Sequence, residues 1–216
     1  MVRVGILGSV GSGKSFVANI FEKLGFDIFS ADAEVARIYK NNKVINKKIS
    51  KFFKLKLYKN RINREELRNF IKKYPKKFKF LNQTIHPLIR KRLVNFLKKN
   101  KNKKLVVLDI PLIIENKLFK FVDIFIFIKT KPKAFNNRIT RRKNLDKTFL
   151  KILRKQQVNE QIKERYANFV VFNNSKNKVT LQIKNIIHSI INNKDPQTAG
   201  KLYEFLMARI AGGFTP

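Results

Sequence analysis

The sequence contains no cysteine, so it can form neither a disulfide nor a thiolate metal site. Acidic residues are also scarce: 14 Asp and Glu stand against 49 Lys and Arg, which gives a formal net charge of +35. No uncharged apolar run approaches the roughly 20 residues that cross a bilayer, and no signal peptide is visible. We therefore expect a cytoplasmic protein without a membrane association.

The excess of positive charge first suggests a nucleic-acid-binding protein. The lysines, however, are spread along nearly the whole chain, and Asn, Ile and Phe accompany them. All four residue types have A/T-rich codons, so we interpret most of the charge as genome composition displayed on solvated faces. The charge should still attract anionic nucleotides and bind polyanions non-specifically, without a specific nucleic-acid partner.

The segment from Gly8 to Ser15 spells G-x-x-x-x-G-K-[ST], a phosphate-binding loop. An apolar run at 2–7 predicts a buried strand before it, and apolar spacing over 16–24 predicts a helix after it. Glycines let backbone N–H groups turn toward a phosphate, and the helix N-terminus adds its positive dipole end. Lys14 would bridge the β- and γ-phosphates of ATP, and the Ser15 hydroxyl would hold Mg²⁺. The nucleotide contacts that we expect here are Gly8, Gly11, Ser12, Gly13, Lys14, Ser15 and Phe16.

The remaining apolar runs predict a parallel α/β sheet. Strands are expected over 25–29, 105–109, 122–128 and 169–172, separated by helical segments that make right-handed crossovers. Ligands of such sheets bind at the carboxyl ends of the strands. The phosphate loop, Asp32 and Asp109 should therefore meet at that edge.

The length fits one α/β domain with an inserted helical lobe. We expect one domain over 1–194, with its core at 1–40 and 104–194. A helical substrate lobe would occupy about 41–103 and a basic lid about 132–166. A long helix is expected over 82–99, with Pro87 near its start. Residues 195–216 differ in composition and form an appended tail without chemistry.

Two aspartates have alternative interpretations. Asp32 follows the second strand and could orient an acceptor hydroxyl, or it could cap the next helix. Asp109 ends a buried strand and could hold Mg²⁺ directly or through water, or it could be a turn residue. Glu115 could order the following helix or face substrate.

The basic residues are equally open to two interpretations. Arg138 and Arg142 lie four residues apart on one helical face, either as lid arginines that stabilise transition-state charge or as part of a solvated face. His86 is one of two histidines, and no second ligand at metal spacing accompanies it, so zinc is not expected.

Several separated segments together resemble the dephospho-CoA kinase family. They are GILGSVGSGKS, LGFDIFSADAEVAR, HPLIRKRL, VLDIPLIIENKL and ANFVVFNN, and the resemblance extends from Val2 to about Ile191. The loop alone is generic, whereas H-P-x-x-R followed by D-x-P-L-x-x-E is specific. The resemblance implies a three-layer, adenylate-kinase-like P-loop kinase fold. It also implies ATP- and Mg²⁺-dependent phosphorylation of the ribose 3′-hydroxyl of dephospho-CoA, which gives CoA and ADP.

The resemblance also assigns residue roles. Asp32 takes the position of the acceptor-orienting aspartate, and Arg138 and Arg142 those of lid arginines. Gln157 matches a glutamine after the lid, and Asn173 matches an asparagine near the adenine. The expected substrate contacts are Asp32, His86, Arg90, Pro111 and Glu115.

The chain departs from the family pattern in three places. Phe16 stands where the family usually has Thr, Lys143 and Asn144 replace Asp-Gly after the lid arginine, and Asn168 replaces an acid. Another small-molecule kinase of the same fold, or a basic nucleic-acid-binding ATPase, are the competing functions. We expect a monomer.

Overall fold

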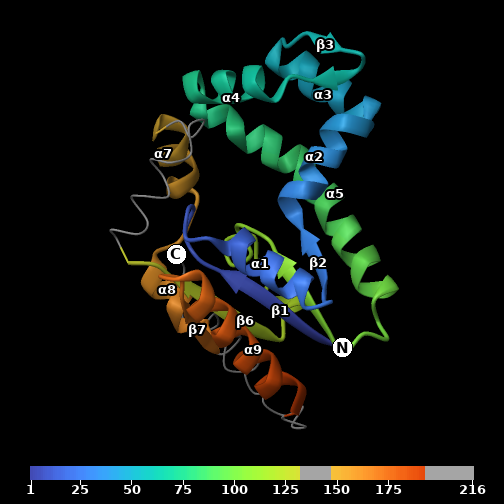
Figure 1. Ribbon diagram of the computed structural model, residues 1–216. Coiled ribbons are helices and arrows are strands. Elements are labelled where there is room, and N and C mark those ends of the chain that lie inside the picture. Colours follow the sequence, from blue (N-terminus) through green and yellow to red (C-terminus); the bar gives the residue numbers. More distant parts are fainter. Residues whose placement is uncertain (132–146, 193–216) are drawn as a thin grey trace, which may run out of the picture. The chain divides into compact units, whose positions relative to one another are not determined.

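The computed structural model of the protein describes residues 1–131 and 147–192 (Figure 1). The contacts divide the chain into two compact units. The sheet unit contains Met1–Phe29 together with the described residues 100–131 and 154–192. The helical unit contains Ser30–Lys99 and the described residues 147–153.

The sheet unit is built on five strands in the order β2-β5-β1-β6-β7. They are β1 (Val2–Leu7), β2 (Asp27–Ser30), β5 (Leu105–Asp109), β6 (Ile124–Lys129) and β7 (Phe169–Phe172). Strand β1 pairs in parallel with β5 on one side and β6 on the other, and β6 pairs in parallel with β7. All five strands expected from the sequence are present, and the parallel α/β class is confirmed.

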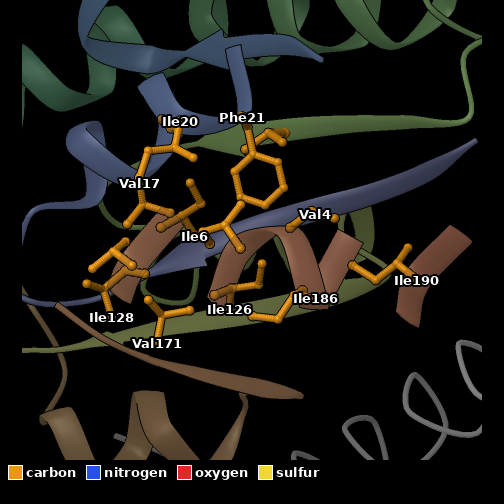
Figure 2. Packing of buried hydrophobic residues seen from close by; sticks show 14 of the residues in the cluster. Val4, Ile6, Val17, Ile20, Phe21, Ile126, Ile128, Val171, Ile186 and Ile190 are labelled. Carbon is orange, nitrogen blue, oxygen red and sulfur yellow. The ribbon is translucent and has the colours of Figure 1, made fainter. Parts of the chain in front are cut away.

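Helices flank this sheet. Helix α1 (Lys14–Lys23) and helix α9 (Lys176–Asn192) contact each other and cover one face, with α8 (Glu160–Arg165) preceding β7. Figure 2 shows the core under α1 and α9, where alternate strand residues such as Ile6 and Ile126 meet Phe21 and Ile186. The intervening strand residues are buried as well, Phe125 and Phe127 being 1% exposed. Burial of both faces explains why these strands read as continuous apolar runs.

The helical unit is assembled around the long helix α5 (Phe78–Lys99). Helices α2 (Ala31–Asn41), α3 (Lys43–Phe53) and α4 (Arg64–Lys73) accompany it, with a two-stranded hairpin of β3 (Leu57–Tyr58) and β4 (Arg61–Ile62). The described part of α7 (Lys147–Lys155) lies partly in this unit. A cluster of aromatic rings surrounds the buried Phe53, which meets Phe52, Phe70 and Phe80 edge to face, and the exposed Phe52 stacks on Phe80 with 3.6 Å between centroids.

Two details differ from the sequence expectation. Helix α5 begins at Phe78, so Pro87 lies inside the helix and not near its start. The helix continues through the proline because its buried face, which includes Leu81, Ile85, Ile89 and Leu93, compensates for the lost hydrogen bond. Helix α2, expected in the core, clusters with the helical unit because it packs on α5 and β4.

Among the described helices, none combines the length and apolar character that a bilayer-spanning helix needs.

Candidate active site

The glycine-rich loop joins β1 to α1 with a backbone that only glycine adopts readily. Gly8, Gly11 and Gly13 all have positive φ angles, of 150°, 92° and 94°. A Cβ at Gly8 would lie 2.5 Å from Ser12 Oγ and 3.2 Å from the Ile128 carbonyl oxygen. Both the conformation and the space therefore require glycine at this position.

Helix α1 begins at Lys14, with Gly13 as its N-cap and no acidic residue in its first turn. Gly13 has no side chain, so the cap makes no side-chain hydrogen bond to the first N–H groups. These groups and the positive end of the helix dipole suit an anion. The local sequence thus builds a phosphate site from backbone alone.

The Lys14 ammonium lies across the loop. Its Nζ donates to the carbonyl oxygens of Gly8 at 2.9 Å and Ser9 at 3.0 Å. The charge is therefore held beside the loop backbone, where a polyphosphate seated on the loop would meet it. A bound phosphate oxygen would compete with these two neutral acceptors and offers the stronger, charge-assisted hydrogen bond.

Ser15 and Asp109 face each other at the carboxyl edge of the sheet. Ser15 Oγ donates to Asp109 Oδ2 at 3.4 Å, and the Asp109 residue is only 6% exposed at the end of β5. Hydroxyl and carboxylate oxygens are the ligands that Mg²⁺ prefers, and it usually takes few of them from the protein. Within residues 1–131 and 147–192, no three acidic or histidine side chains cluster as a metal site. The residues fit a Mg²⁺ ion that takes its other ligands from phosphate and water.

Other side chains hold the loop from outside. The Ser12 carbonyl accepts hydrogen bonds from Asn173 Nδ2 at 2.8 Å and from Thr130 Oγ1 at 2.9 Å. Asn173, expected near the adenine, is 1% exposed and contacts the loop. Gln157 Oε1 accepts the backbone N–H of Val10 at 3.1 Å. Sequence reasoning missed Thr130, although a polar residue directly after the buried strand β6 was an available signal.

Three further expected residues have other surroundings. Phe16 is partly buried and packs against the core of the sheet unit. Pro111 and Glu115 follow β5, and Glu115 Oε1 accepts the backbone N–H of Val158 at 2.9 Å. Arg138 and Arg142 lie outside the described residues.

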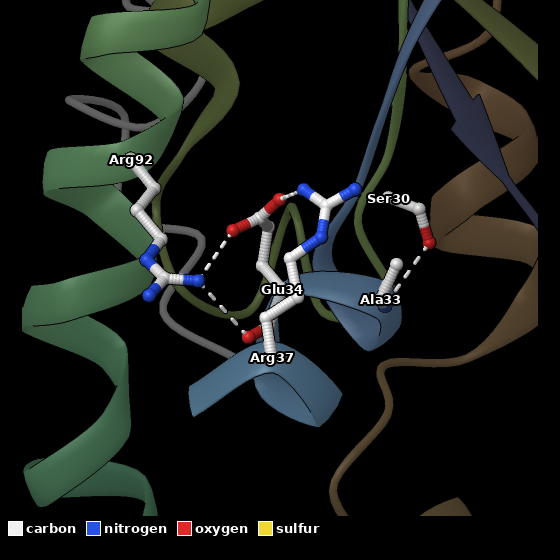
Figure 3. A network of polar contacts seen from close by, with 5 residues as sticks. All are labelled: Ser30, Ala33, Glu34, Arg37 and Arg92. Carbon is white, nitrogen blue, oxygen red and sulfur yellow. Dashed lines mark hydrogen bonds and ion pairs between the residues drawn. The ribbon is translucent and has the colours of Figure 1, made fainter. Parts of the chain in front are cut away.

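Asp32 belongs to the helical unit, in the first turn of α2, and is exposed. The cap of α2 is Ser30, whose Oγ accepts the N–H of Ala33 at 3.4 Å (Figure 3). Glu34 forms ion pairs with Arg37 and with Arg92 of α5. The alternative that Asp32 caps the helix is therefore wrong, and its carboxylate is available for other contacts.

His86 and Arg90 lie one turn apart on α5 and line a hollow of about 530 Å³. Burial, with a smaller contribution from the Arg90 charge, lowers the pKa of His86 below its usual value. The imidazole is therefore biased toward its neutral form beside a permanent cation. The lining residues of the hollow are Gln83, His86, Pro87, Arg90, Lys91, Val94 and Asn95.

Comparison with known proteins points to one family. The sequence model of the dephospho-CoA kinase family matches residues 2–178. Dephospho-CoA kinase of Wolbachia pipientis is 30% identical over 190 residues, covering 87% of this chain and 97% of its own. That of Ehrlichia canis is 31% identical over 198 residues, covering 90% and 98%.

Solved structures have the same fold. Dephospho-CoA kinase from Campylobacter jejuni superposes with a TM-score of 0.62 at 25% identity, over 87% of this chain and 96% of its own. A Thermus thermophilus protein gives a TM-score of 0.73 at 23% identity, over 89% and 98%. The second likeness bears on the fold alone.

Proposed function

The chain belongs to the dephospho-CoA kinase family, and on that premise we propose that it transfers the γ-phosphoryl group of ATP to the ribose 3′-hydroxyl of dephospho-CoA. The products are CoA and ADP, so the reaction is the last step of CoA synthesis. The observation that carries the proposal is the phosphate loop, with Lys14 across it and Ser15 facing Asp109. Phosphoryl transfer requires mainly positioning and charge stabilisation, which these groups supply.

The donor side of the reaction uses the loop. Backbone N–H groups of the loop and of the first turn of α1 bind the phosphates, and Lys14 neutralises charge between the β- and γ-phosphates. Ser15 and Asp109 would hold Mg²⁺, directly or through water, and the ion when bound neutralises charge on the same phosphates. Asn173 and Thr130 keep the loop in shape through the Ser12 carbonyl.

The acceptor side uses the helical unit. Asp32 orients the 3′-hydroxyl and accepts its proton, while His86 and Arg90 bind the acceptor's polar and anionic groups. Two observations support this assignment: Ser30 caps α2 in place of Asp32, and His86 and Arg90 share one hollow. Pro111 and Glu115 stay predicted substrate contacts, and Arg138 and Arg142 stay predicted lid residues.

Both substrates are polyanions that do not cross a bilayer unaided, so we propose that the enzyme works in the cytoplasm. The net charge of +35 raises their local concentration, without implying a specific nucleic-acid partner. A monomer stays our prediction for the oligomeric state of the enzyme.

A coupled assay of ADP release tests the function. We expect turnover with dephospho-CoA and none with adenosine, AMP or shikimate at equal concentration. Preference for one of the other acceptors would assign a different kinase of this fold. ATP hydrolysis that DNA or RNA stimulates, without transfer to any acceptor, would replace the proposal with a nucleic-acid-binding ATPase.

A further inference from the structure

A buried ion pair lies in the sheet unit apart from the phosphate loop. Lys163 of α8 is 3% exposed, and its Nζ lies 3.5 Å from Glu115 Oε1. Lysine is rarely buried unless it is paired, because removing its charge from water is expensive. Burial lowers the pKa of Lys163, and the charge of Glu115 opposes that effect. The pair therefore needs an explanation beyond packing.

Glu115 connects this pair to a backbone segment. The same oxygen that faces Lys163 accepts the N–H of Val158 at 2.9 Å. Val158 directly follows Gln157, whose Oε1 accepts the N–H of Val10 at 3.1 Å. Contacts thus run from Lys163 to Glu115, along residues 157–158, and on to the phosphate loop.

The loop needs such support because its backbone is unusually free. Its three glycines lose more conformational freedom on ordering than other residues would. A loop already fixed in its binding shape loses less entropy when a nucleotide arrives, so preorganisation raises affinity. Val10 lies between Gly8 and Gly11, so fixing its N–H restricts the backbone of the loop between these two glycines.

We propose that Lys163 is a positioning residue for nucleotide binding. It holds Glu115 so that residues 157–158 present Gln157 to Val10, and the phosphate loop is fixed before ATP binds. This inference rests on the proposed function of the loop as the ATP site.

The competing explanation is that the pair merely stabilises the fold around α8. The two differ in what happens when Gln157 is absent. If Lys163 acts through Gln157, removing both should weaken binding no more than removing Gln157 alone. If Lys163 is only structural, its removal should lower the melting temperature and leave the affinity unchanged.

The test measures the Kd for ADP by calorimetry, the KM for ATP and the melting temperature in the full-length protein. We expect Lys163→Met and Gln157→Leu each to raise the Kd about three- to tenfold, the effect of losing one hydrogen bond. The double variant should resemble Gln157→Leu alone in its Kd for ADP.

Two further variants sharpen the result. Lys163→Met combined with Glu115→Gln removes both charges but keeps an oxygen for Val158, so it should recover most of the affinity. Glu164 lies beside Lys163 on α8, and Glu164→Gln breaks its exposed ion pair with Lys129 of β6, so this control should leave the Kd for ADP unchanged. If Lys163→Met does not fold, Lys163→Arg, which displaces the charge, takes its place with the same expectation.

Wild-type affinity in a folded Lys163 variant overturns the inference, and so do losses that add in full with Gln157→Leu. Failure of the wild-type protein to bind ADP at all would instead overturn the proposed function.

Discussion

Replacing Gly8 by alanine should damage the phosphate loop in a way that the structure quantifies. The new Cβ would lie 2.5 Å from Ser12 Oγ, closer than non-bonded atoms approach, on a backbone with φ of 150°. Ser12 is 2% exposed, so it has little room to yield. Gly25→Ala is the matched control: its φ is also positive, at 87°, but a Cβ there would meet nothing within 4 Å.

Both substitutions place alanine at a positive φ angle, but only Gly8→Ala also creates steric overlap. Alanine at positive φ costs about 1–3 kcal/mol, offset by about 0.4–1 kcal/mol from the less flexible unfolded chain. Gly25→Ala should therefore lose about 1 kcal/mol of unfolding free energy. Gly8→Ala adds steric overlap, which in packed sites costs about 1–3 kcal/mol more. An extra 2 kcal/mol corresponds to a melting temperature about 4–8 °C lower for a chain of this size.

Thermal melts and calorimetric titration with ADP distinguish the cost of backbone strain from that of steric overlap in the loop. We expect Gly8→Ala to melt below Gly25→Ala and to bind ADP at least about tenfold more weakly, because relief of the overlap distorts the loop. Gly25→Ala should bind ADP like the wild-type protein. Equal melting temperatures together with equal affinity would refute the argument that the loop requires this backbone for phosphate binding.

Four further predictions concern other residues. Lys14→Ala should keep its melting temperature and lose on the order of a hundredfold in kcat/KM for ATP, and near-wild-type turnover would contradict the role of the loop. Asp32→Asn should keep the Kd for ADP and lose about a hundredfold or more in kcat, whereas an active variant would remove Asp32 from the reaction. Because the folded protein lowers the pKa of His86, the unfolded chain binds a proton at this histidine more readily, and stability falls as the pH drops through about 6.5. Thermal melts at several pH values should therefore show a smaller loss of melting temperature at acidic pH for His86→Gln than for wild type. Deleting residues 195–216 should leave turnover and melting temperature unchanged, and a marked drop in either would give the tail a structural role.

The parts of the fold that the sequence predicted are those that local pattern controls. The strand expected over 105–109 matches β5, which is buried along its whole length, because a strand buried on both faces appears in the sequence as a continuous apolar run. The hairpin of β3 and β4 was missed, since strands of two residues carry no periodic signal. The order of the strands depends on long-range pairing, which one sequence does not reveal.

In the candidate site too, the residues of a local motif were predicted, whereas contacts between distant residues were not. Lys14 and Ser15 are predicted by the spacing of the phosphate-loop motif, whereas Asp32 was assigned through the family resemblance, and the structure adds only that it does not cap α2. Two polar residues compete to cap α2, and only the backbone shows that Ser30 does so. Asn173 was found through the resemblance, but its contact with the Ser12 carbonyl spans 161 positions and has no sequence signature.

These observations lead to a distinction between making the phosphate site and maintaining it. In the proposed site, the groups that would meet the phosphates are mostly backbone N–H groups, which only a substitution to proline would remove. Their geometry is maintained by distant side chains: Asn173 and Thr130 at the Ser12 carbonyl, and Gln157 at Val10. Substitutions at these supporting residues should therefore change nucleotide affinity more than the rate of transfer, whereas substitutions at Lys14 and Asp32 should do the reverse. The ratio of the two effects, measured residue by residue, identifies which side chains hold the loop and which act on the reacting groups.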